Sequence, residues 1–235
     1  MNSGFTDMHG HFVYGVDDGA QTRSDMEAMI DAAFADGLSR MYGTSHVTPG
    51  LRPFNFELYS LHLEEGRQYC ARKNYPLSLF SGAELLYTPA MRPYLQRGLP
   101  TLGKTDFILV EFVPDISSAE MERAFAELSD SPYTPIIAHI ERYPSLFSNH
   151  NARRFKERYP LYYQVNCRTA IHGLPGLVRN HTLKSWFKEG LVDFIASDAH
   201  NTGDRPTMMS AAYKALSETW GEEMALRLCS NPELA

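Results

Sequence analysis

Short apolar runs alternate along this chain with longer stretches in which apolar side chains recur every three or four positions. The short runs have the length of buried strands, and the longer stretches have the periodicity of helices with one buried face. Strands are therefore expected at residues 5–8, 41–44, 77–83, 107–110, 135–138, 161–165 and 194–197. Helices are expected at about 24–37, 55–73, 90–97, 117–128, 151–158, 177–189 and 207–220.

Signals at the helix ends support this division. Ser24 and Glu27 have the spacing of a capping box, in which two side chains bind each other's main-chain N–H groups, and Ser117 and Glu120 repeat it. Gly37 follows the first expected helix, and glycine commonly ends helices because it tolerates a positive φ.

The strict alternation of strand and helix predicts right-handed βαβ units and a parallel sheet. A chain of 235 residues fits one α/β domain, residues 1–235. We expect a single distorted TIM-like barrel with seven parallel strands inside and helices outside, a (β/α)7 arrangement.

Composition narrows the class of protein. Hydrophobic residues make up 43% of the chain, yet none of the apolar runs approaches the roughly 18 residues of a membrane span, so membrane insertion is not expected. The N-terminal residues have neither a basic segment nor an apolar run, and the three cysteines are too few for a disulfide framework, which together predict a cytoplasmic protein. The formal charge of −6 argues against a nucleic-acid binder.

Polar side chains follow the expected strands at or near their carboxyl ends. In a parallel barrel these ends share one face, so residues far apart in sequence meet there. The residues at these positions are His9, His46, Glu84, Glu111, His139, Asn166 and Asp198.

The segment Asp7-Met8-His9-Gly10-His11 is the first motif with metal-ligand spacing. Alternate residues of an extended segment face one side, so His9 and His11 can bind one ion, and we expect Asp7 to orient the first histidine from behind. An isolated His-x-His is usually a surface feature. Asp198 and His200 have the same spacing near the end of the chain.

Acidic residues complete the candidate set. Glu84 and Glu111 each leave an apolar strand, where an unpaired carboxylate is costly, so the partner is either a cation or an arginine such as Arg142 or Arg205. The pair Asp17-Asp18 in the first loop is either a solvated turn or a further ligand source. Four other histidines, His62, His150, His172 and His181, are expected at the surface of helices or loops.

Nine candidate ligands are too many for one ion. They are His9, His11, Asp18, His46, Glu84, Glu111, His139, Asp198 and His200. Mixed imidazole and carboxylate ligands suit Mn²⁺, Fe or Zn²⁺, and two or three ions fit their number. Such a centre indicates hydrolysis, because neighbouring ions activate a shared water. Arg142 and Arg205, unless they form structural ion pairs, indicate a phosphate substrate.

These motifs resemble the PHP (polymerase and histidinol phosphatase) superfamily, and within it the bacterial manganese-dependent protein-tyrosine phosphatases of capsule and exopolysaccharide operons. The segments that carry the resemblance are Asp7-x-His9-x-His11, Asp17-Asp18-Gly19, Thr44-Ser45-His46, Glu84, Glu111-Phe112, His139-Ile140-Glu141-Arg142-Tyr143 and Ser197-Asp198-Ala199-His200-Asn201. One departure is Val47, where relatives often carry a second histidine, and another is the unusual segment 48–54.

The resemblance implies two or three divalent ions, most naturally Mn²⁺, and a choice of Asp18 over Asp17 as ligand. It implies three ligand sets: His9, His11, Glu111 and Asp198; Glu84, Glu111 and His139; Asp18, His46, Glu84 and His200. It also implies that Arg142 and Arg205 bind the phosphate, and that a metal-bridging hydroxide hydrolyses phosphotyrosine on a membrane-associated bacterial tyrosine kinase.

Rival functions share parts of this pattern. They are a PHP phosphoesterase acting on a small ester such as histidinol phosphate, an amidohydrolase or metal-dependent deoxyribonuclease, and an inactive kinase-binding scaffold. A cysteine-dependent phosphatase is excluded, because none of Cys70, Cys167 and Cys229 is followed six positions later by arginine.

Overall fold

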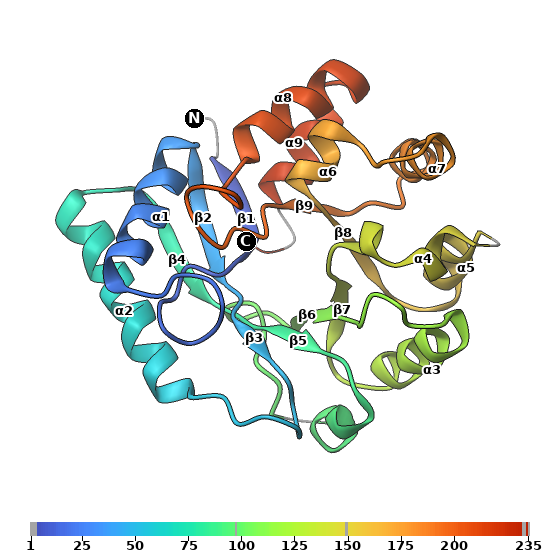
Figure 1. The fold of residues 1–235 in the computed structure, drawn as a ribbon, viewed down its shortest axis with the longest axis horizontal. Coiled ribbons are helices and arrows are strands. Elements are labelled where there is room, and N and C mark those ends of the chain that lie inside the picture. The colour runs from blue at the N-terminus through green and yellow to red at the C-terminus, as the bar shows by residue number, and fades with distance from the viewer. Residues whose placement is uncertain (1–3, 97, 149, 232–233, 235) are drawn as a thin grey trace.

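Parallel strands form the centre of the molecule, and helices surround them (Figure 1). The computed structural model describes residues 4–96, 98–148, 150–231 and 234. One sheet has the order β1-β2-β4, and the other has the order β3-β5-β6-β7-β8-β9. The strands are β1 (Phe5–Gly10), β2 (Leu38–Gly43), β3 (His46–Val47), β4 (Ser78–Ser81), β5 (Glu84–Leu86), β6 (Phe107–Glu111), β7 (Thr134–Ile137), β8 (Tyr162–Asn166) and β9 (Phe194–Ala196). All of these pairings are parallel, which confirms the expected α/β class.

Each of the seven expected apolar runs overlaps a strand. In two of them, residues 41–44 and 77–83, the strand is interrupted and a second short strand follows. β2 stops at Gly43 and β3 starts at His46, while β4 and β5 are separated by residues 82–83. The buried hydroxyl of Tyr59 holds the breaks together, since it donates to Gly43 O at 2.6 Å and accepts from Gly82 N at 3.0 Å. A Cβ at Gly43 would meet Val13 Cγ2 at 2.8 Å, so this close approach requires glycine.

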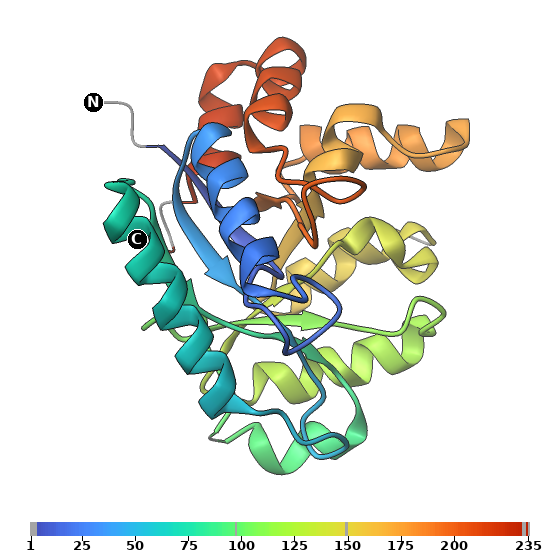
Figure 2. The same cartoon turned by 60° about the vertical axis from the view of Figure 1, so that its left-hand side comes forward.

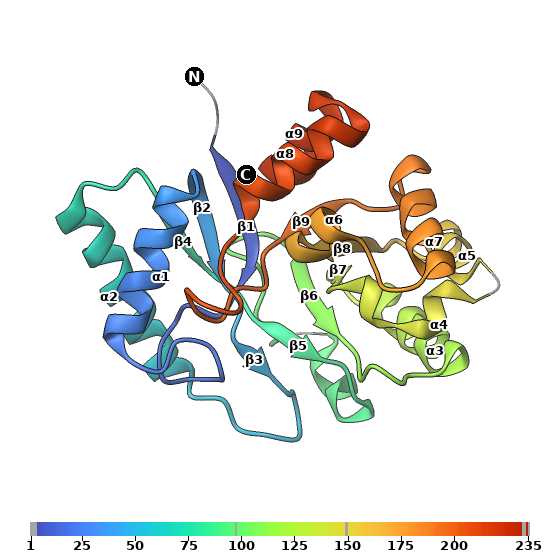
Figure 3. The same cartoon turned by 45° about the horizontal axis from the view of Figure 1, so that its top comes forward.

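The ends of the first and last strands lie side by side (Figure 3). An isolated parallel bridge pairs Gly10 with Ala199. His9 O accepts a hydrogen bond from Asp198 N, and Ala199 O accepts one from His11 N, both at 2.8 Å. These contacts bring the two termini of the strand series together at the end of the fold that carries the polar motifs.

Helices form the outer layer. They are α1 (Arg23–Ala35), α2 (Phe56–Lys73), α3 (Ser118–Ser129), α4 (Pro144–Phe147), α5 (Asn151–Arg158), α6 (Cys167–His172), α7 (Leu177–Lys188), α8 (Met209–Trp220) and α9 (Glu222–Ser230), with 3-10 turns η1 (Pro89–Tyr94) and η2 (Ile140–Arg142). Figure 2 shows α2 alongside α1 on the outside of the first sheet. Among the described helices, none combines the length and the apolar composition needed to cross a bilayer.

Most expected helices are present with ends within about two residues, and the exceptions have local causes. The helix expected at 90–97 is the 3-10 turn η1, which contains Pro93, and Arg97 lies outside the described residues. α6 is too short to show periodicity, and α9 continues α8 after a break at Gly221 with φ +93°. Neither of these two helices was expected from the sequence.

The capping prediction for α1 is wrong by two residues. The capping box joins Thr22 and Asp25: Asp25 N donates to Thr22 Oγ1 at 3.2 Å, and Thr22 N donates to an Asp25 carboxylate oxygen at 2.8 Å. Two overlapping motifs with the same spacing compete here, and the earlier one starts the helix. The Ser117–Glu120 box of α3 is confirmed.

One of the histidines expected at the surface is buried. The ring of His62 stacks on Tyr14 with centroids 3.5 Å apart, and Nδ1 of His62 lies 2.8 Å from Tyr14 O. This histidine belongs to the packing of α2 against the first loop.

Candidate metal centre

Eight of the nine candidate ligands lie in three overlapping groups, and the ninth, His139, lies outside them beside Glu84. His9 and His11 leave β1, His46 and Glu84 begin β3 and β5, Glu111 closes β6, and Asp198 and His200 follow β9, while Asp18 comes from the first loop. The groups are His11, Asp18, His46 and His200; His9, His11, Glu84 and Asp198; and His46, Glu84 and Glu111. Within each group the ligand atoms lie within 4.8 Å of one another.

Glu84 is the centre of this arrangement. Its Oε1 lies 2.8 Å from His139 Nε2, and its Oε2 lies 3.2 Å from His9 Nε2, 3.3 Å from His11 Nε2 and 3.1 Å from His46 Nδ1. The side chain is only 1% exposed. Burial alone would raise the pKa of Glu84, but His9, together with the other imidazoles, holds that pKa well below its usual range.

The geometry fits the binding of cations. Glu84 Oε2 and His200 Nε2 are buried, and neither has a hydrogen-bond partner of acceptable geometry among the described residues. Buried polar atoms are rarely left in this condition unless an ion or ordered water satisfies them. His200 belongs to one of the three groups and Glu84 to the other two, so cations held by these groups would satisfy both atoms.

The imidazoles respond to the same carboxylates. Burial lowers the pKa of His9, but Glu84 and Asp198 outweigh it and raise that pKa to about 9. Burial likewise opposes protonation of His11, and hydrogen bonds to Asp17 and Glu84 raise its pKa to about 9. In His200, burial and the neighbouring His11 lower the pKa to about 4. The carboxylates therefore hold protons on two imidazoles at positions that a metal ion would occupy.

Side chains behind the ligands orient them. Asp17 Oδ2 lies 2.8 Å from His11 Nδ1 and accepts from His46 N at 3.1 Å, so Asp17 points away from the centre while Asp18 points toward it. Gln164 Oε1 lies 3.2 Å from Nδ1 of His9. Partners of this kind set which ring nitrogen is free to bind a metal.

The expected contact between Asp7 and the ring of His9 is wrong. Asp7 accepts hydrogen bonds from Ser197 N at 3.0 Å and Ser197 Oγ at 2.5 Å, and a long one from the main-chain N of His9 at 3.4 Å. Gln164 occupies the place beside the His9 imidazole. Asp7 therefore ties β1 to the segment after β9, and it stabilises backbone rather than a metal ligand.

Two of the candidate ligands have strained backbone. His139 has φ +32° and Asp198 has φ +56°, and neither residue is glycine. Such conformations cost about 1–3 kcal/mol each and persist where surrounding contacts enforce them, often in functional sites. Here the strain turns both side chains from the strand ends into the centre.

Asp198 also joins the two candidate phosphate-binding arginines to the centre. Arg142 Nη2 lies 2.5 Å from Asp198 Oδ2, and Arg205 Nη2 lies 2.8 Å from Asp198 Oδ1. Asn166 Nδ2 donates to Asp198 Oδ2 at 3.0 Å. Among the described residues the arginines pair with Asp198 and not with Glu84 or Glu111, so the alternative of an arginine partner for either glutamate is not observed.

The geometric groups and the sets implied by the resemblance differ in detail. In the group of His9, His11 and Asp198 the glutamate is Glu84, where the resemblance implies Glu111. His139 contacts Glu84 at 2.8 Å and Glu111 at 3.8 Å, as in the implied second set. The group with Asp18 lacks only Glu84 from the implied third set, and holds His11 in its place.

The centre opens onto a cleft of about 470 Å³. The candidate ligands Asp18, His46 and Glu111 line this cleft. Thr48, Arg52, Pro53 and Phe54, from the unusual segment 48–54, line it as well.

Sequence reasoning missed Gln164 and gave Asp17 no role. Gln164 lies inside the apolar run of β8, and a lone amide within a buried strand is a signal for a hydrogen-bonded role. For Asp17 the signal was its position beside Asp18 in a glycine-flanked acidic pair, because either carboxylate of such a pair can contact the site.

Comparison with known proteins agrees with this geometry. The profile of the family "Capsular polysaccharide synthesis, CpsB/CapC" matches residues 5–234. Tyrosine-protein phosphatase CpsB of Streptococcus agalactiae serotype III (strain NEM316) is 31% identical over 233 residues, which cover 94% of this chain and 93% of that protein. The solved structure presented as YwqE from Bacillus subtilis and CpsB from Streptococcus pneumoniae, unique metal-dependent tyrosine phosphatases, has a TM-score of 0.81 at 26% identity, and covers 94% of this chain and 89% of that one.

A more distant likeness concerns the fold alone. An amidohydrolase from Mycoplasma synoviae has a TM-score of 0.58 at 11% identity, over 99% of this chain and 87% of that one. The match to the family profile, in contrast, spans nearly the whole chain and confirms the resemblance carried by the motifs. This chain belongs to the CpsB/CapC family of capsular polysaccharide synthesis.

Proposed function

We propose that this chain is a metal-dependent protein-tyrosine phosphatase. The observation that carries the proposal is the position of Asp198, whose Oδ1 lies 3.5 Å from His9 Nε2 while its two oxygens contact Arg142 and Arg205. A metal-ligand cluster and a pair of guanidinium groups thus meet at one carboxylate. That combination suits a substrate with a phosphate group, because guanidinium binds phosphate oxygens bidentately.

In this proposal the nine candidate ligands hold two or three divalent ions. When bound, such ions supply positive charge and activate water for hydrolysis at neutral pH. With ions bound, Asp198 would serve as one of their ligands, and Arg142 and Arg205 would bind the phosphate oxygens, where their positive charge would oppose the negative charge of the transition state. Both arginine side chains are partly exposed, at 42% and 37%, so a substrate phosphate could reach them.

The finer points of the proposal follow from the family. We propose Mn²⁺ as the native ion, with Fe or Zn²⁺ as alternatives, because the ligand set mixes imidazole and carboxylate. Phosphotyrosine on a membrane-associated tyrosine kinase is the proposed substrate, in line with the activity named for CpsB. The three free cysteines suit a reducing cytoplasm.

We also propose that residues 1–235 form a single domain and that the two sheets close into a distorted seven-stranded barrel. The hydrogen bonds between the ends of β1 and the segment after β9 support closure on one side. The continuation of β2 into β3 and of β4 into β5 would carry the strand series from one sheet to the other.

The test combines metal analysis with phosphate release. We expect two or three ions per chain after loading with Mn²⁺, and phosphate release from a phosphotyrosine peptide that a chelator abolishes. Arg142→Ala should lower kcat/KM by about 10²–10³. Faster turnover of histidinol phosphate than of the peptide would favour the small-ester phosphoesterase, and binding of a kinase tail without turnover would favour the scaffold.

A further inference from the structure

The main chain next to each candidate phosphate-binding arginine is held by another arginine. Arg142 is the last residue of η2, and the carbonyl of its neighbour Glu141 accepts a hydrogen bond from Arg179 Nη2 at 2.8 Å. Arg205 follows Asp204, whose carbonyl accepts from Arg168 Nη2. The same contact therefore occurs twice, each time one residue before an arginine that reaches Asp198.

Arg179 is built into its position. Its guanidinium carbon lies 4.7 Å from the ring centroid of Phe147, so the cation on α7 lies over an aromatic ring of α4. Its Nε is buried and has no partner among the described residues. Arg179 is half-buried and forms no ion pair with the described residues, and its guanidinium group donates to a main-chain carbonyl instead. We therefore assign it the support of η2 as its structural role.

The segment that Arg179 supports is held on its other side as well. Glu141 Oε1 accepts from Asn166 N at 3.0 Å, and His139 N donates to Gln164 Oε1 at 2.8 Å. These contacts fix the strained turn against β8, whereas Arg179 fixes its outer carbonyl. Without Arg179 that carbonyl would lose its partner, and the turn could rotate away from the centre.

The second loop has the same construction. Asn201 Oδ1 accepts from Arg205 N at 3.1 Å, and Arg205 O accepts from His200 N at 2.9 Å, so the loop folds back on the end of β9. Arg168, on α6, holds the carbonyl of Asp204 at the tip of this loop. Arg168 is exposed, so its contact is less insulated from water than that of Arg179.

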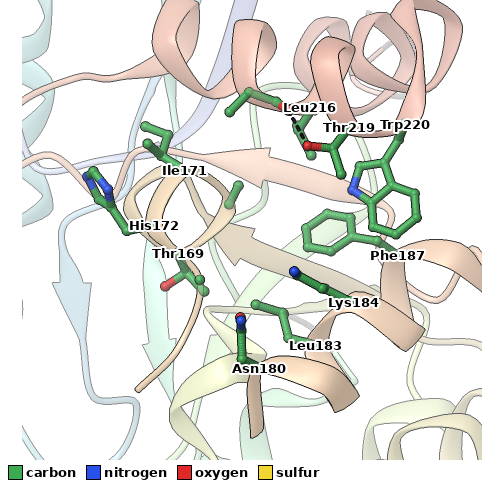
Figure 4. A pocket seen from close by; sticks show the side chains of 13 residues that line it. Thr169, Ile171, His172, Asn180, Leu183, Lys184, Phe187, Leu216, Thr219 and Trp220 are labelled. Atoms are coloured by element: carbon green, nitrogen blue, oxygen red, sulfur yellow. Dashed lines mark hydrogen bonds between the residues drawn. The ribbon is translucent and has the colours of Figure 1, made fainter. Parts of the chain in front are cut away.

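Both supporting arginines belong to one structural unit. α6 carries Arg168 and α7 carries Arg179, and the two helices pack with α8 around a pocket of about 230 Å³ (Figure 4). Asn180 Oδ1 accepts from Leu174 N at 3.2 Å, which ties the start of α7 to the loop after α6. The unit therefore joins the two loops that carry Arg142 and Arg205.

We propose that Arg179 and Arg168 are positioning residues that act through Arg142 and Arg205, respectively, in phosphate binding. The inference rests on the proposed function, because the two arginines that are held in place, Arg142 and Arg205, are the ones to which that function assigns phosphate binding. Neither supporting arginine touches the substrate. Their effect is to hold the loops so that both guanidinium groups reach one phosphate, and displacement of such a group by about 1 Å can lower a rate by about 10²-fold.

A double-mutant cycle tests the inference. Arg179→Ala should lower kcat/KM for a phosphotyrosine peptide by about 10- to 100-fold and weaken inhibition by inorganic phosphate by a similar factor, with metal content unchanged. In the Arg142→Ala background, Arg179→Ala should cause no further loss. The same cycle with Arg168→Ala and Arg205→Ala should show the same lack of additivity, with a smaller first effect.

Arg154→Ala is the matched control. Arg154 also lies 4.7 Å over a phenylalanine ring, that of Phe155, and pairs with Glu122 on the outer surface, so its loss should leave activity unchanged. If Arg179→Ala does not fold, Arg179→Met, which keeps the aliphatic stem but removes every N–H donor, is measured instead.

The outcomes separate the two proposals. If Arg142→Ala is inactive while Arg179→Ala, or Arg179→Met in its place, keeps activity within twofold of wild type, the positioning role is overturned and the phosphatase proposal stands. Full additivity of the two losses would also overturn it, since Arg179 would then act independently of Arg142. Full activity of Arg142→Ala would instead overturn the phosphate-binding role on which the inference rests.

Discussion

Gln164 Oε1 lies 3.2 Å from Nδ1 of the His9 imidazole, and both side chains are buried. The same oxygen accepts a hydrogen bond from the main-chain N of His139 at 2.8 Å. Because an amide oxygen only accepts, the contact requires a proton on Nδ1 of His9 and makes Nε2 the nitrogen that faces Glu84 and Asp198. One neutral residue of β8 thus sets the orientation of two candidate ligands.

Gln164→Leu should weaken metal binding. The change removes the acceptor for His9 Nδ1 and leaves His139 N without its partner, and loss of such a contact behind a ligand typically costs about 10- to 100-fold in metal affinity. The measurement is titration of the metal-free protein with Mn²⁺. Gln68→Leu, on the exposed face of α2, is the control and should bind as wild type does. Equal affinities in the two variants would contradict the orienting role of Gln164.

Removal of metal should lower thermal stability. Glu84 is buried among four imidazoles, and without ions their charges are balanced only by one another and by protons. A bound ion at about 100 times its dissociation constant adds about 2.7 kcal/mol to the free energy of unfolding. Differential scanning calorimetry with and without chelator measures the shift.

Glu84→Gln is the informative variant for this measurement. It keeps the shape of the side chain but removes the charge that all the neighbouring imidazoles share, so metal should raise its Tm much less than that of the wild type. An unchanged response of Tm to metal in Glu84→Gln would show that the ions bind elsewhere.

The arrangement of the strands was predictable because their residues obey short-range rules. Apolar runs of strand length alternate with helical stretches, and parallel strands place their carboxyl ends together, so His9, Glu111 and Asp198 could be brought to one place from sequence alone. The break after Gly43 was not predictable in the same way. It depends on the hydroxyl of Tyr59 on α2, 16 residues after Gly43, and neither residue's local sequence reveals this contact.

The limits for the site are of the same kind. Candidate ligands could be named from residue type and spacing, but the partner of each imidazole depends on distances between strands. Asp7 and Gln164 illustrate this, because sequence proximity favoured Asp7 as the partner of His9, whereas β8 places Gln164 there. Likewise, nothing in the local sequence of Arg179 indicates that its guanidinium reaches the carbonyl of Glu141.

Cys167→Ala should keep the activity of the folded enzyme. Cys167 is fully buried beside Met209, and burial raises the pKa of its thiol well above the usual range, so a reactive thiolate does not form at neutral pH. The cavity left by the sulfur should cost about 1–2 kcal/mol in the free energy of unfolding. Phosphate release per folded molecule is the measurement, and His139→Ala, which removes a candidate ligand, should be nearly inactive beside it. Loss of turnover in Cys167→Ala with metal still bound would require a thiol in the reaction.

Metal affinity should rise with pH up to about pH 9. In the metal-free protein, carboxylates hold the pKa of both His9 and His11 at about 9, whereas only a neutral imidazole can bind an ion. At pH 7.5 both rings are imidazolium cations, and each must release one proton when the metal binds. For each proton released, the metal affinity rises about tenfold when the pH is raised by one unit. His200, with its pKa lowered to about 4, is already neutral and releases none. Calorimetric titration with Mn²⁺ at pH 7.5 in two buffers of different ionisation enthalpy counts the protons. A count near zero would mean that His9 and His11 have ordinary pKa values. Glu84 and the neighbouring aspartates would then not raise these pKa values, contrary to what the short distances indicate.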